Sequence, residues 1–494
     1  MVPLSRPSLS RETAIASLAG VAAVAISYAL VGRAQAFVAA PVEAFLSRTM
    51  PGALITFAIT TVGSLGQELN FAMAAVLVAV AFGLLVRLSL FARATLGGGA
   101  TLLAGVTTCV LAFLLSGQPI HALLVTGGVV AIVAAGELAS AFQRGDPLSS
   151  KRRRALSIIG GAVGLAAVGY QAGRYKAPSA TAEEAATLEG QTVDREVIED
   201  RLAEAEAAEI DEERLDALVS DQFYNVDINA VDPELDAGDW ELSITGAVET
   251  ERTYSYDDVR RMPTEHRFAT LRCVGETLNG HKIDSALWTG TPVRSFIEAA
   301  NPEGDCECVM LHGADGYSVQ FPIDALEPGL LAYGMNGNVL PRAHGYPVRA
   351  LVPGHWGEVN AKWLTEIEFL EEAVDGYWEQ RGWHGTGPVV PVAKLHTEAD
   401  HPDGRLLGGH AYGGTRGVSR VEVSIDGGDT WTEARLSDDL PDEDMWRQWA
   451  YTYDPPEESH TVVVRMVDDD GTIQPKEERP RFPRGPSGWV SSSY

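Results

Sequence analysis

Apolar residues gather in six long stretches in the first third of the chain and then give way to short alternating runs. Most of the stretches approach the ~20 residues that a helix needs to cross hydrocarbon. The pattern therefore predicts an N-terminal all-α transmembrane bundle over residues 1–174. One stretch is short, so five and six spans both remain open. The stretches cover residues 13–32, 51–66, 71–91, 95–116, 121–142 and 155–170.

Basic residues beside these stretches predict how the bundle is oriented. Arg144 and the run Lys151–Arg154 precede the last stretch and should lie in the cytoplasm, which places everything after residue 175 outside. Arg6 and Arg11 fall on the opposite side and conflict with this orientation. The run SSKRRRALSIIGGAVGLAAVG also resembles a twin-arginine export signal. A plain positive-inside anchor explains it equally well.

The remaining chain predicts three further segments. Residues 175–220 are rich in Ala and Glu, with apolar residues spaced as in an exposed amphipathic helix or stalk. Residues 221–387 mix short strands with short helices, which predicts an α+β domain. Residues 388–494 hold alternating strands separated by Gly and Asp turns, which predicts an all-β sandwich.

Charge divides the chain at the same place. Residues 1–176 hold 13 Lys and Arg against 5 Asp and Glu, whereas the rest holds 25 against 62, and the whole chain carries −29. An acidic folded half argues against nucleic-acid binding, which needs a basic surface. Dense surface carboxylates favour solubility at high salt, so we interpret the source as a halophile; an ordinary acidic secreted domain is the alternative.

Four cysteines are too few for a disulfide framework in a chain of this length. Cys306 and Cys308 lie two apart in an expected strand, share one face, and are interpreted as buried packing residues rather than metal ligands. Cys273 follows the strand RFATLR and enters a loop, from which a thiolate could reach a ligand. Composition alone favours a structural role for it.

From FYNVDI almost to its end, the chain resembles the sulfite-oxidase family of molybdopterin enzymes. The resemblance rests on DWELSITGAV, TLRCVGE, LWTGTPV, LLAYGMNGNVLPRAHGYPVRALVPGHWGEVNAKWL and VEVSIDGGDTW. It covers over half the chain and none of the expected membrane part. It implies a molybdopterin-binding domain over 221–387 and an immunoglobulin-like dimerisation domain over 388–494, and therefore a homodimer.

The resemblance also implies site residues. In this family a cysteine thiolate, a soft ligand, binds molybdenum beside the dithiolene of the cofactor, and Cys273 in TLRCVGE matches that cysteine. Tyr333 matches the tyrosine beside the oxo group of the metal. Arg349 is a natural partner for the phosphate of the pterin. The implied cofactor contacts are Tyr224, Asn225, Val226, Cys273, Asp315, His344, Arg349, Asn360, Ala361 and Lys362.

Two positions depart from the family. Sulfite oxidases bind their substrate with arginines, but this chain has Tyr224 and Asn225 at one such position and Glu276 to Leu278 at the other. Sulfite is therefore doubtful as the substrate, unless His281, Lys282, Arg416 or Arg420 compensates. His396, His401 and His410 match no familiar metal site and are expected at the surface.

These features favour an enzyme that transfers an oxygen atom and two electrons on a small substrate outside the cytoplasm. Reduction of a sulfoxide or an oxyanion by the same fold is one alternative, and a non-catalytic membrane sensor is the other. No haem motif is attached, so the electrons should pass to a separate carrier of the cytochrome or copper-protein type.

Overall fold

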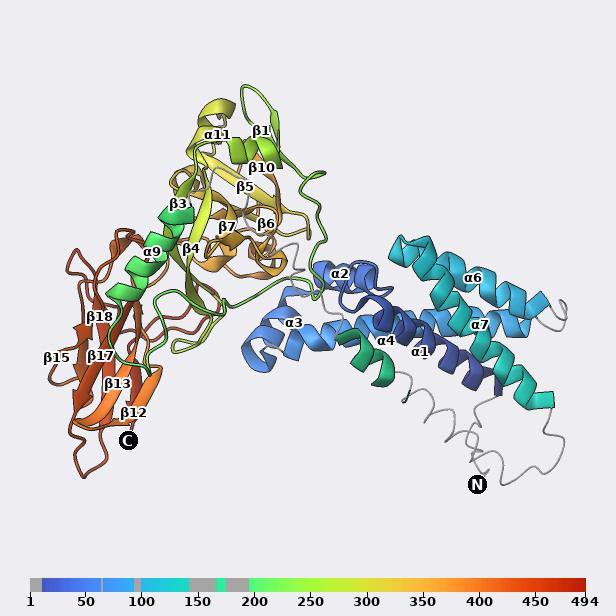
Figure 1. Cartoon of the computed structure of the whole chain (residues 1–494), viewed down its shortest axis with the longest axis horizontal. Helices are drawn as coiled ribbons and strands as arrows, with labels where there is room; N and C mark the ends of the chain where they lie inside the picture. Colours follow the sequence, from blue (N-terminus) through green and yellow to red (C-terminus); the bar gives the residue numbers. More distant parts are fainter. Residues whose placement is uncertain (1–10, 64, 93–98, 142–163, 165–166, 175–194) are drawn as a thin grey trace. The chain divides into compact units, whose positions relative to one another are not determined.

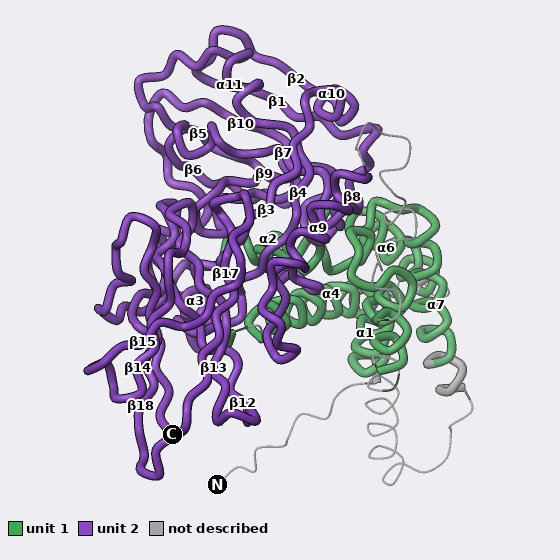
Figure 2. Tube along the Cα trace, turned by 60° about the vertical axis from the view of Figure 1, so that its left-hand side comes forward, with its two compact units in different colours: residues 1–50, 62–181, 227–234 green, residues 51–61, 182–226, 235–494 purple. Residues whose placement is uncertain are grey.

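The computed structural model describes residues 11–63, 65–92, 99–141, 164, 167–174 and 195–494. It forms two compact units (Figure 2). Unit 1 comprises residues 1–50, 62–181 and 227–234, and unit 2 comprises residues 51–61, 182–226 and 235–494. Residues 51–61 belong to unit 2, although the residues on both sides of them in sequence belong to unit 1. Residues 227–234 likewise belong to unit 1, although their sequence neighbours belong to unit 2. The basic run Lys151–Arg154 lies outside the described residues.

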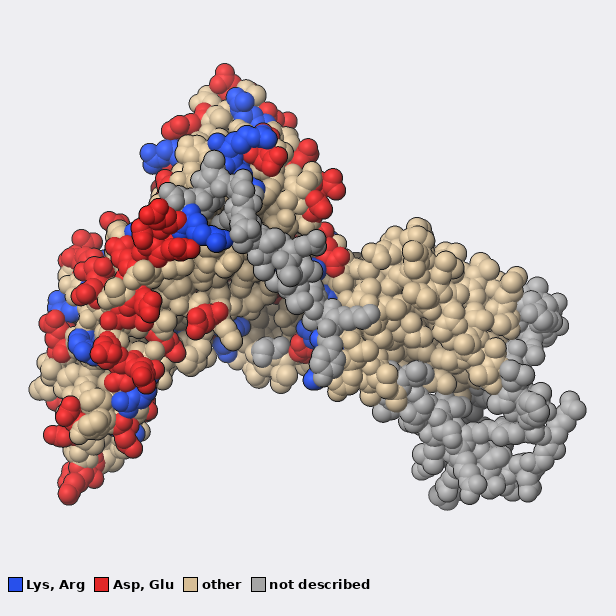
Figure 3. Space-filling model, in the orientation of Figure 1, with Lys and Arg blue, Asp and Glu red and all other residues tan. Residues whose placement is uncertain are grey.

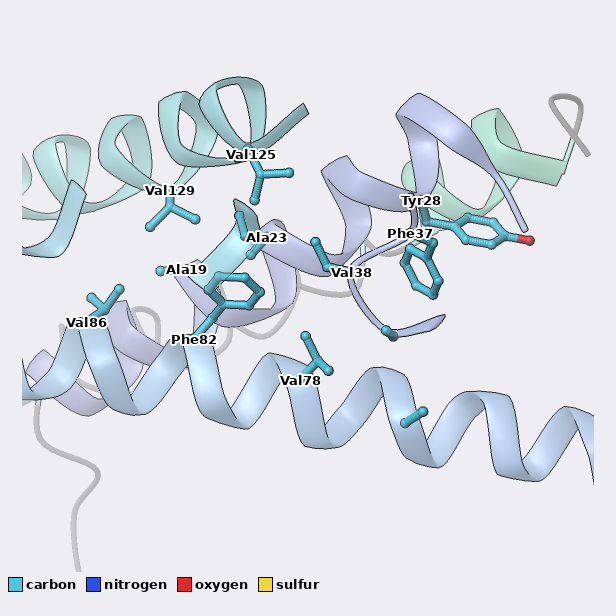
Figure 4. Close-up of a cluster of buried hydrophobic side chains, with 14 of the residues drawn as sticks. Ala19, Ala23, Tyr28, Phe37, Val38, Val78, Phe82, Val86, Val125 and Val129 are labelled. Atoms are coloured by element: carbon cyan, nitrogen blue, oxygen red, sulfur yellow. The ribbon is translucent and has the colours of Figure 1, made fainter. Parts of the chain in front are cut away.

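Unit 1 is helical, as the apolar stretches predict (Figure 1). Its described helices include α1 (Arg11–Val31), α2 (Ala40–Thr49), α4 (Leu65–Phe91), α6 (Gly99–Ser116) and α7 (Pro119–Ala141). Small and β-branched residues from α1, α4 and α7 meet in its core. Figure 4 shows Ala19 and Ala23 facing Val78, Phe82, Val125 and Val129.

Two of these helices, over Glu12–Val31 and Leu65–Phe91, are long and apolar enough to cross a membrane. The bent pair formed by Ala40–Thr49 and Gly52–Val62 passes the same test together, with a 102° bend. Apolar helices over Thr101–Ser116 and Pro119–Ala135 are shorter. Much of the stretch 155–170 lies outside the described residues, so the expected five or six spans stay a prediction.

Unit 2 begins with short helical segments. Helix α3 (Gly52–Phe57) and the π-helical turn η1 (Ala58–Val62) follow α2 in sequence. The acidic stretch contains helix α9 (Arg195–Ala208), where an amphipathic helix was expected. Ile198 and Ala205 of α9 are buried, and the Arg201 guanidinium pairs with Asp442. Helix α9 therefore packs on the folded domain along one face and is not a free stalk.

Two five-stranded sheets build the α+β part of unit 2 (Figure 1). The first has the order β2-β1-β10-β5-β6, with β1 and β10 parallel. The second has the order β3-β4-β7-β8, and β9 also pairs with β7. The elements are β1 (Glu241–Gly246), β2 (Arg252–Ser255), α10 (Tyr256–Arg261), β3 (Glu265–Arg272), β4 (Ile283–Pro292), α11 (Arg294–Ala300), β5 (Cys308–Gly313), β6 (Ser318–Pro322), α12 (Ile323–Leu326), β7 (Leu330–Met335), β8 (Asn338–Val339), η2 (Arg342–His344), β9 (Arg349–Leu351), η3 (Gly357–Val359), β10 (Leu364–Leu370) and η4 (Glu379–Arg381).

The C-terminal part is the expected all-β sandwich. One sheet has the order β11-β13-β17-β16 with β12 beside β13, and the other has the order β15-β14-β18-β19. Val421, Trp449 and Val464 are among the buried residues of its core. The elements are β11 (Val392–Ala393), β12 (Thr397–His401), β13 (Gly404–Tyr412), η5 (Gly414–Arg416), β14 (Arg420–Ser424), β15 (Thr432–Glu433), β16 (Arg435–Leu436), β17 (Arg447–Tyr453), β18 (Thr461–Val467) and β19 (Val490–Ser493).

Charge follows the two units. Figure 3 shows many acidic side chains over the surface of unit 2, whereas the described surface of unit 1 is mostly uncharged. The carboxylates therefore lie on a folded surface. Unit 2 has many buried apolar residues, so its acidic composition is not that of a disordered segment.

One expectation about side chains is incomplete and another is wrong. Cys306 and Cys308 pack with Met310 and Leu370 as expected, but they also form a disulfide. The turn before β5 brings their sulfurs together, which an ideal strand would not do. His410 was expected at the surface but is 1% exposed, because β13 is an inner strand of its sheet.

Glycine allows α1 and α4 to approach closely, which generates a prediction. A Cβ at Gly20 would lie 2.0 Å from the carbonyl oxygen of Ala79. We expect Gly20→Val to destabilise unit 1 by at least about 1–3 kcal/mol, because the helices must separate. A Cβ at Gly127 of α7 meets nothing within 4 Å, so Gly127→Val is the matched control. Thermal unfolding in detergent measures both, and equal midpoints would refute the packing.

Candidate active site

Cys273 follows β3 directly and opens the loop that leads to β4. Its backbone N–H donates to the Lys282 carbonyl at 2.9 Å, and its own carbonyl accepts from the Glu276 N–H at 3.3 Å. The loop is therefore a closed turn that holds the thiol at the end of a buried strand. Burial raises the pKa of Cys273, while the positive charge of Lys282 opposes that rise. A bound cation that stabilises the thiolate would overcome this penalty.

A buried ion cluster fixes the far side of this loop. The Arg272 Nε donates to the Glu276 Oε1 at 2.7 Å, and the Lys394 Nζ donates to the same oxygen at 2.6 Å. All three side chains are 0–1% exposed. Arg272 also lies 4.7 Å from the ring of Trp356. Burial lowers the pKa of Lys394 to about 7, with a further decrease from the Arg272 charge and an opposing increase from Glu276.

Arg272, the strand neighbour of Cys273, enters the buried ion cluster with Glu276 and Lys394. Lys394 follows β11 in the C-terminal domain. The sequence could not predict its role in the cluster, because its partner Glu276 lies 118 residues away. The same cluster explains the acid at position 276: its carboxylate balances two cations.

The expected cofactor residues converge on one region. The Lys362 Nζ donates to the Asn225 Oδ1 at 2.6 Å and to the Ala343 carbonyl at 2.8 Å. The Arg349 guanidinium contacts the carbonyls of His344 at 3.2 Å and Asn360 at 3.1 Å. These contacts bring together four parts of the chain that the sequence separates by up to 137 positions. They are the segment before β1, η2, β9 and the turn after η3.

Other expected residues support this region. Tyr224 donates its N–H to Asp284 at 2.7 Å, and the Cys273 and Arg349 charges both act on its hydroxyl. Ala361 is buried, and its N–H bonds to Val359, whereas Val226 is 40% exposed. The Asp315 carboxylate accepts from the Tyr317 N–H at 3.0 Å and so stabilises the β5–β6 turn.

Electrostatics in this region favour an anionic ligand. Burial lowers the pKa of His344 to about 3, and the charges of Arg349 and Lys362 lower it further. His344 is therefore neutral at pH 7 and offers either a donor or an acceptor to a polar ring. Arg349 and Lys362 place two cations in the same region as His344, and such a pair of cations suits a phosphate.

Tyr333 occupies a different environment. Its hydroxyl pairs with the Thr264 hydroxyl at 2.9 Å, and its ring lies edge-on to Tyr256. The described contacts of the cysteine loop instead involve Trp383, which packs with Val274 in one core cluster and is 1% exposed. The role of Tyr333 beside an oxo group stays a prediction, and Trp383 is an aromatic residue that the sequence analysis missed.

A second missed residue is Glu358. Its pKa rises to about 8, mainly through burial and then through the charge of Glu379. Its charge also acts on Cys273. A Cβ at Gly385 would lie 2.6 Å from Val274 and 2.8 Å from the Glu358 Oε1, so the carboxyl and the cysteine loop approach the same glycine. Glu358 is therefore mostly protonated at pH 7 and can donate a proton.

A segment from the N-terminal region also packs on this loop within unit 2. Ile59 joins the core cluster of Val274 and Trp383. The Arg481 guanidinium donates to the Gly275 carbonyl at 3.0 Å and to the Thr60 carbonyl at 2.7 Å. Arg481 therefore connects η1 to the residues just after Cys273.

Comparisons with known proteins identify the family of the two folded domains. The oxidoreductase molybdopterin binding domain matches residues 229–378, and the Mo-co oxidoreductase dimerisation domain matches residues 391–481. The uncharacterized oxidoreductase YuiH of Bacillus subtilis is 31% identical over 150 residues, which are 30% of this chain and 74% of that protein. The chain belongs to the sulfite-oxidase family of molybdopterin oxidoreductases.

Other members of the sulfite-oxidase family match over a longer region. Mitochondrial sulfite oxidase of Mus musculus is 30% identical over 299 residues, which cover 49% of this chain and 54% of that protein. The chain thus spans about half the length of this curated relative. The sulfane dehydrogenase SoxCD of Paracoccus pantotrophus aligns with a TM-score of 0.46 and 23% identity, over 54% of this chain and 78% of that chain.

The family binds a molybdenum–molybdopterin cofactor, and the residues present fit it. Cys273 offers a soft thiolate, and Arg349 and Lys362 offer adjacent positive charge. When bound, the cofactor supplies oxygen-atom and two-electron transfer. Beside it, this chain would contribute the Cys273 sulfur as a ligand, the neutral imidazole of His344 and the protonated carboxyl of Glu358.

The thiolate role yields a prediction. Cys273→Ala should reduce turnover to background while the protein stays folded, because the metal loses its protein ligand. Cys109→Ala, in helix α6 of unit 1, is the matched control and should keep wild-type activity. Turnover with an artificial electron carrier, normalised to molybdenum content, measures the effect. Wild-type turnover by Cys273→Ala would refute the assignment.

Proposed function

We propose that this enzyme transfers an oxygen atom on a small substrate that is uncharged or carries one charge, and that sulfite is a poor substrate. The buried Arg272–Glu276–Lys394 cluster is the observation that carries the proposal. Glu276 accepts hydrogen bonds from Arg272 and Lys394 and so offsets positive charge that a substrate anion would otherwise meet near Cys273. A dianion such as sulfite needs concentrated free positive charge.

Two of the basic residues that could replace the missing arginines already have partners, and a third is a lone exposed lysine. Arg416 donates to the Val389 carbonyl and pairs with Asp468, and Arg420 pairs with Glu422. Lys282 is exposed, and its charge acts on Cys273. One exposed lysine suits a neutral molecule or a monoanion better than a dianion.

The protonated Glu358 supports reduction as the favoured direction. Reduction of a sulfoxide consumes two electrons and two protons and yields a sulfide and water, whereas oxidation of sulfite releases two protons. A carboxyl with a pKa of about 8 is mostly protonated at pH 7 and can supply one of these protons. The electrons would come from a separate redox protein of the cytochrome or copper type.

Two alternative functions have less support. Sulfite oxidation is favoured only by the names of the relatives, and their full length is not covered. A non-catalytic sensor would not need Cys273, His344, Arg349 and Lys362 in place. The C-terminal sandwich, which matches a dimerisation domain, supports a homodimer.

We place the enzyme on a membrane, with unit 2 outside the cytoplasm. The two long apolar helices and the basic run before residue 155 support this topology. The acidic surface of unit 2 is consistent with a saline exterior (Figure 3).

Substrate choice is the first test of the proposal. We expect kcat/KM for sulfite to fall below that of a true sulfite oxidase by about tenfold to a hundredfold, since a missing buried charged contact costs about 1.5–3 kcal/mol. Dimethyl sulfoxide should be reduced more efficiently than sulfite is oxidised. Steady-state kinetics of the holoenzyme at high salt, with artificial electron carriers, measure both reactions.

The Glu358→Gln variant sharpens this test. Wild-type sulfoxide reduction should decline as the pH rises through about 8, where Glu358 loses its proton, and the variant should be slower at pH 7 without that decline. Sulfite turnover at micromolar KM, or a pH profile that the variant leaves unchanged, would contradict the proposal.

Topology is tested separately. Protease added to intact cells should cleave the chain after about residue 175, since the positive-inside rule places unit 2 outside. Digestion only after lysis would show the opposite orientation.

A further inference from the structure

Three side chains from distant parts of unit 2 meet away from Cys273. Asp216 lies between α9 and β1, His396 lies just before β12, and His410 lies on β13. One ring nitrogen of each histidine and one carboxylate oxygen of Asp216 lie within 4.8 Å of one another. His410 is buried, His396 is half-buried and Asp216 is exposed.

Both histidines present buried nitrogens that have no hydrogen-bond partner. The Nδ1 of His410 and the Nε2 of His396 are the atoms concerned. The Nε2 of His410 contacts the Asp216 carbonyl at 3.2 Å. A carbonyl only accepts, so this Nε2 carries the proton and Nδ1 carries a free lone pair. A buried lone pair without a donor is unusual unless an ion or a water completes it.

The surroundings hold the two imidazoles in the neutral form that binds metals. Burial lowers the pKa of His410 to about 4. Burial and the neighbouring His281 and Lys394 charges lower the pKa of His396 to about 3, although the Gly280 carbonyl opposes this. Both rings therefore keep a lone pair at neutral pH, as metal ligation requires.

The geometry of the cluster is fixed by its neighbours. Trp446 stacks on His410 with ring centroids 3.6 Å apart, so the imidazole cannot rotate freely. The Gln448 Nε2 donates to the Asp216 carbonyl at 2.8 Å, so two donors hold this turn. The backbone N–H of His396 donates to the Gly408 carbonyl at 3.0 Å, which fixes the main chain from which this imidazole projects.

We propose that Asp216, His396 and His410 bind one first-row divalent metal ion, with zinc the best match to two imidazoles and a carboxylate. Zinc–nitrogen bonds of about 2.0–2.1 Å place tetrahedral ligands about 3.3 Å apart, so the three ligand atoms, which lie within 4.8 Å of one another, need to close by at most about 1.5 Å. Asp216 is exposed and can make most of this movement. A water fills the fourth position.

The site would stabilise the start of the cofactor region. Asp216 lies eight residues before Tyr224, and the intervening Ser220 hydroxyl donates to the Asp284 carboxylate that also receives the Tyr224 N–H. A metal at Asp216 would tie this segment to β12 and β13 of the C-terminal sandwich. Its role is therefore structural and independent of the substrate at Cys273.

The experiment uses full-length holoenzyme purified without a polyhistidine tag. First-row metals are counted by mass spectrometry, and ZnCl₂ is then titrated calorimetrically into chelator-treated protein. We expect about one zinc per chain, and at least tenfold weaker binding in His396→Ala and Asp216→Asn, since each loses one of three protein ligands. His401→Ala is the control, because His401 pairs with Glu212 outside the cluster.

Asp216→Asn retains the backbone carbonyl that holds His410, so it keeps the test valid if His396→Ala misfolds. Unfolding temperature should rise with zinc in the wild-type and His401→Ala proteins and should not rise in Asp216→Asn. Wild-type protein that takes up no first-row metal would overturn the proposal. Equal zinc affinity in wild type and Asp216→Asn would overturn it as well.

Discussion

The ion cluster of Arg272, Glu276 and Lys394 is the interaction on which the rest of the active site depends. Three ionisable side chains lie in a region with 0–1% exposure, where the charge of each would be costly without its partners. Their hydrogen bonds join the end of β3, the loop after Cys273 and the residue after β11. One carboxylate therefore fixes the position of the thiol relative to both the α+β part and the sandwich.

This arrangement also decides the charge that a substrate meets. The two cations beside the cysteine, Arg272 and Lys394, are paired with Glu276. The groups whose charges act on Cys273 include Lys282 and the acids Glu276 and Glu358. Burial, with a smaller contribution from the charge of Glu379, raises the pKa of Glu358 to about 8, so Glu358 holds its proton near neutral pH. These charges are the basis of the proposal that the site accepts a less charged substrate that takes up protons.

Much of this site could be read from the sequence, and the remainder could not for identifiable reasons. Cys273, His344, Arg349 and Lys362 stand in local motifs, and the structure brings the last three together with Asn225. Lys394 pairs with Glu276 across 118 residues, a distance that no local pattern encodes. The Cys306–Cys308 disulfide depends on a turn that breaks strand geometry, and the burial of His410 depends on its strand lying inside a sheet. Packing of residues 51–61 with unit 2 was hidden because their composition is that of a membrane segment.

The most direct test of this account is removal of the central charge in Glu276→Gln. The variant leaves Arg272 and Lys394 without an anion, so we expect a loss of about 3–5 kcal/mol in unfolding free energy, together with reduced molybdenum per chain. The control is Glu265→Gln, at the start of β3 and 45% exposed, which should change stability by no more than about 1 kcal/mol. Denaturant unfolding and molybdenum content, measured on both variants, give the answer. Wild-type stability and full molybdenum content in Glu276→Gln would contradict the account.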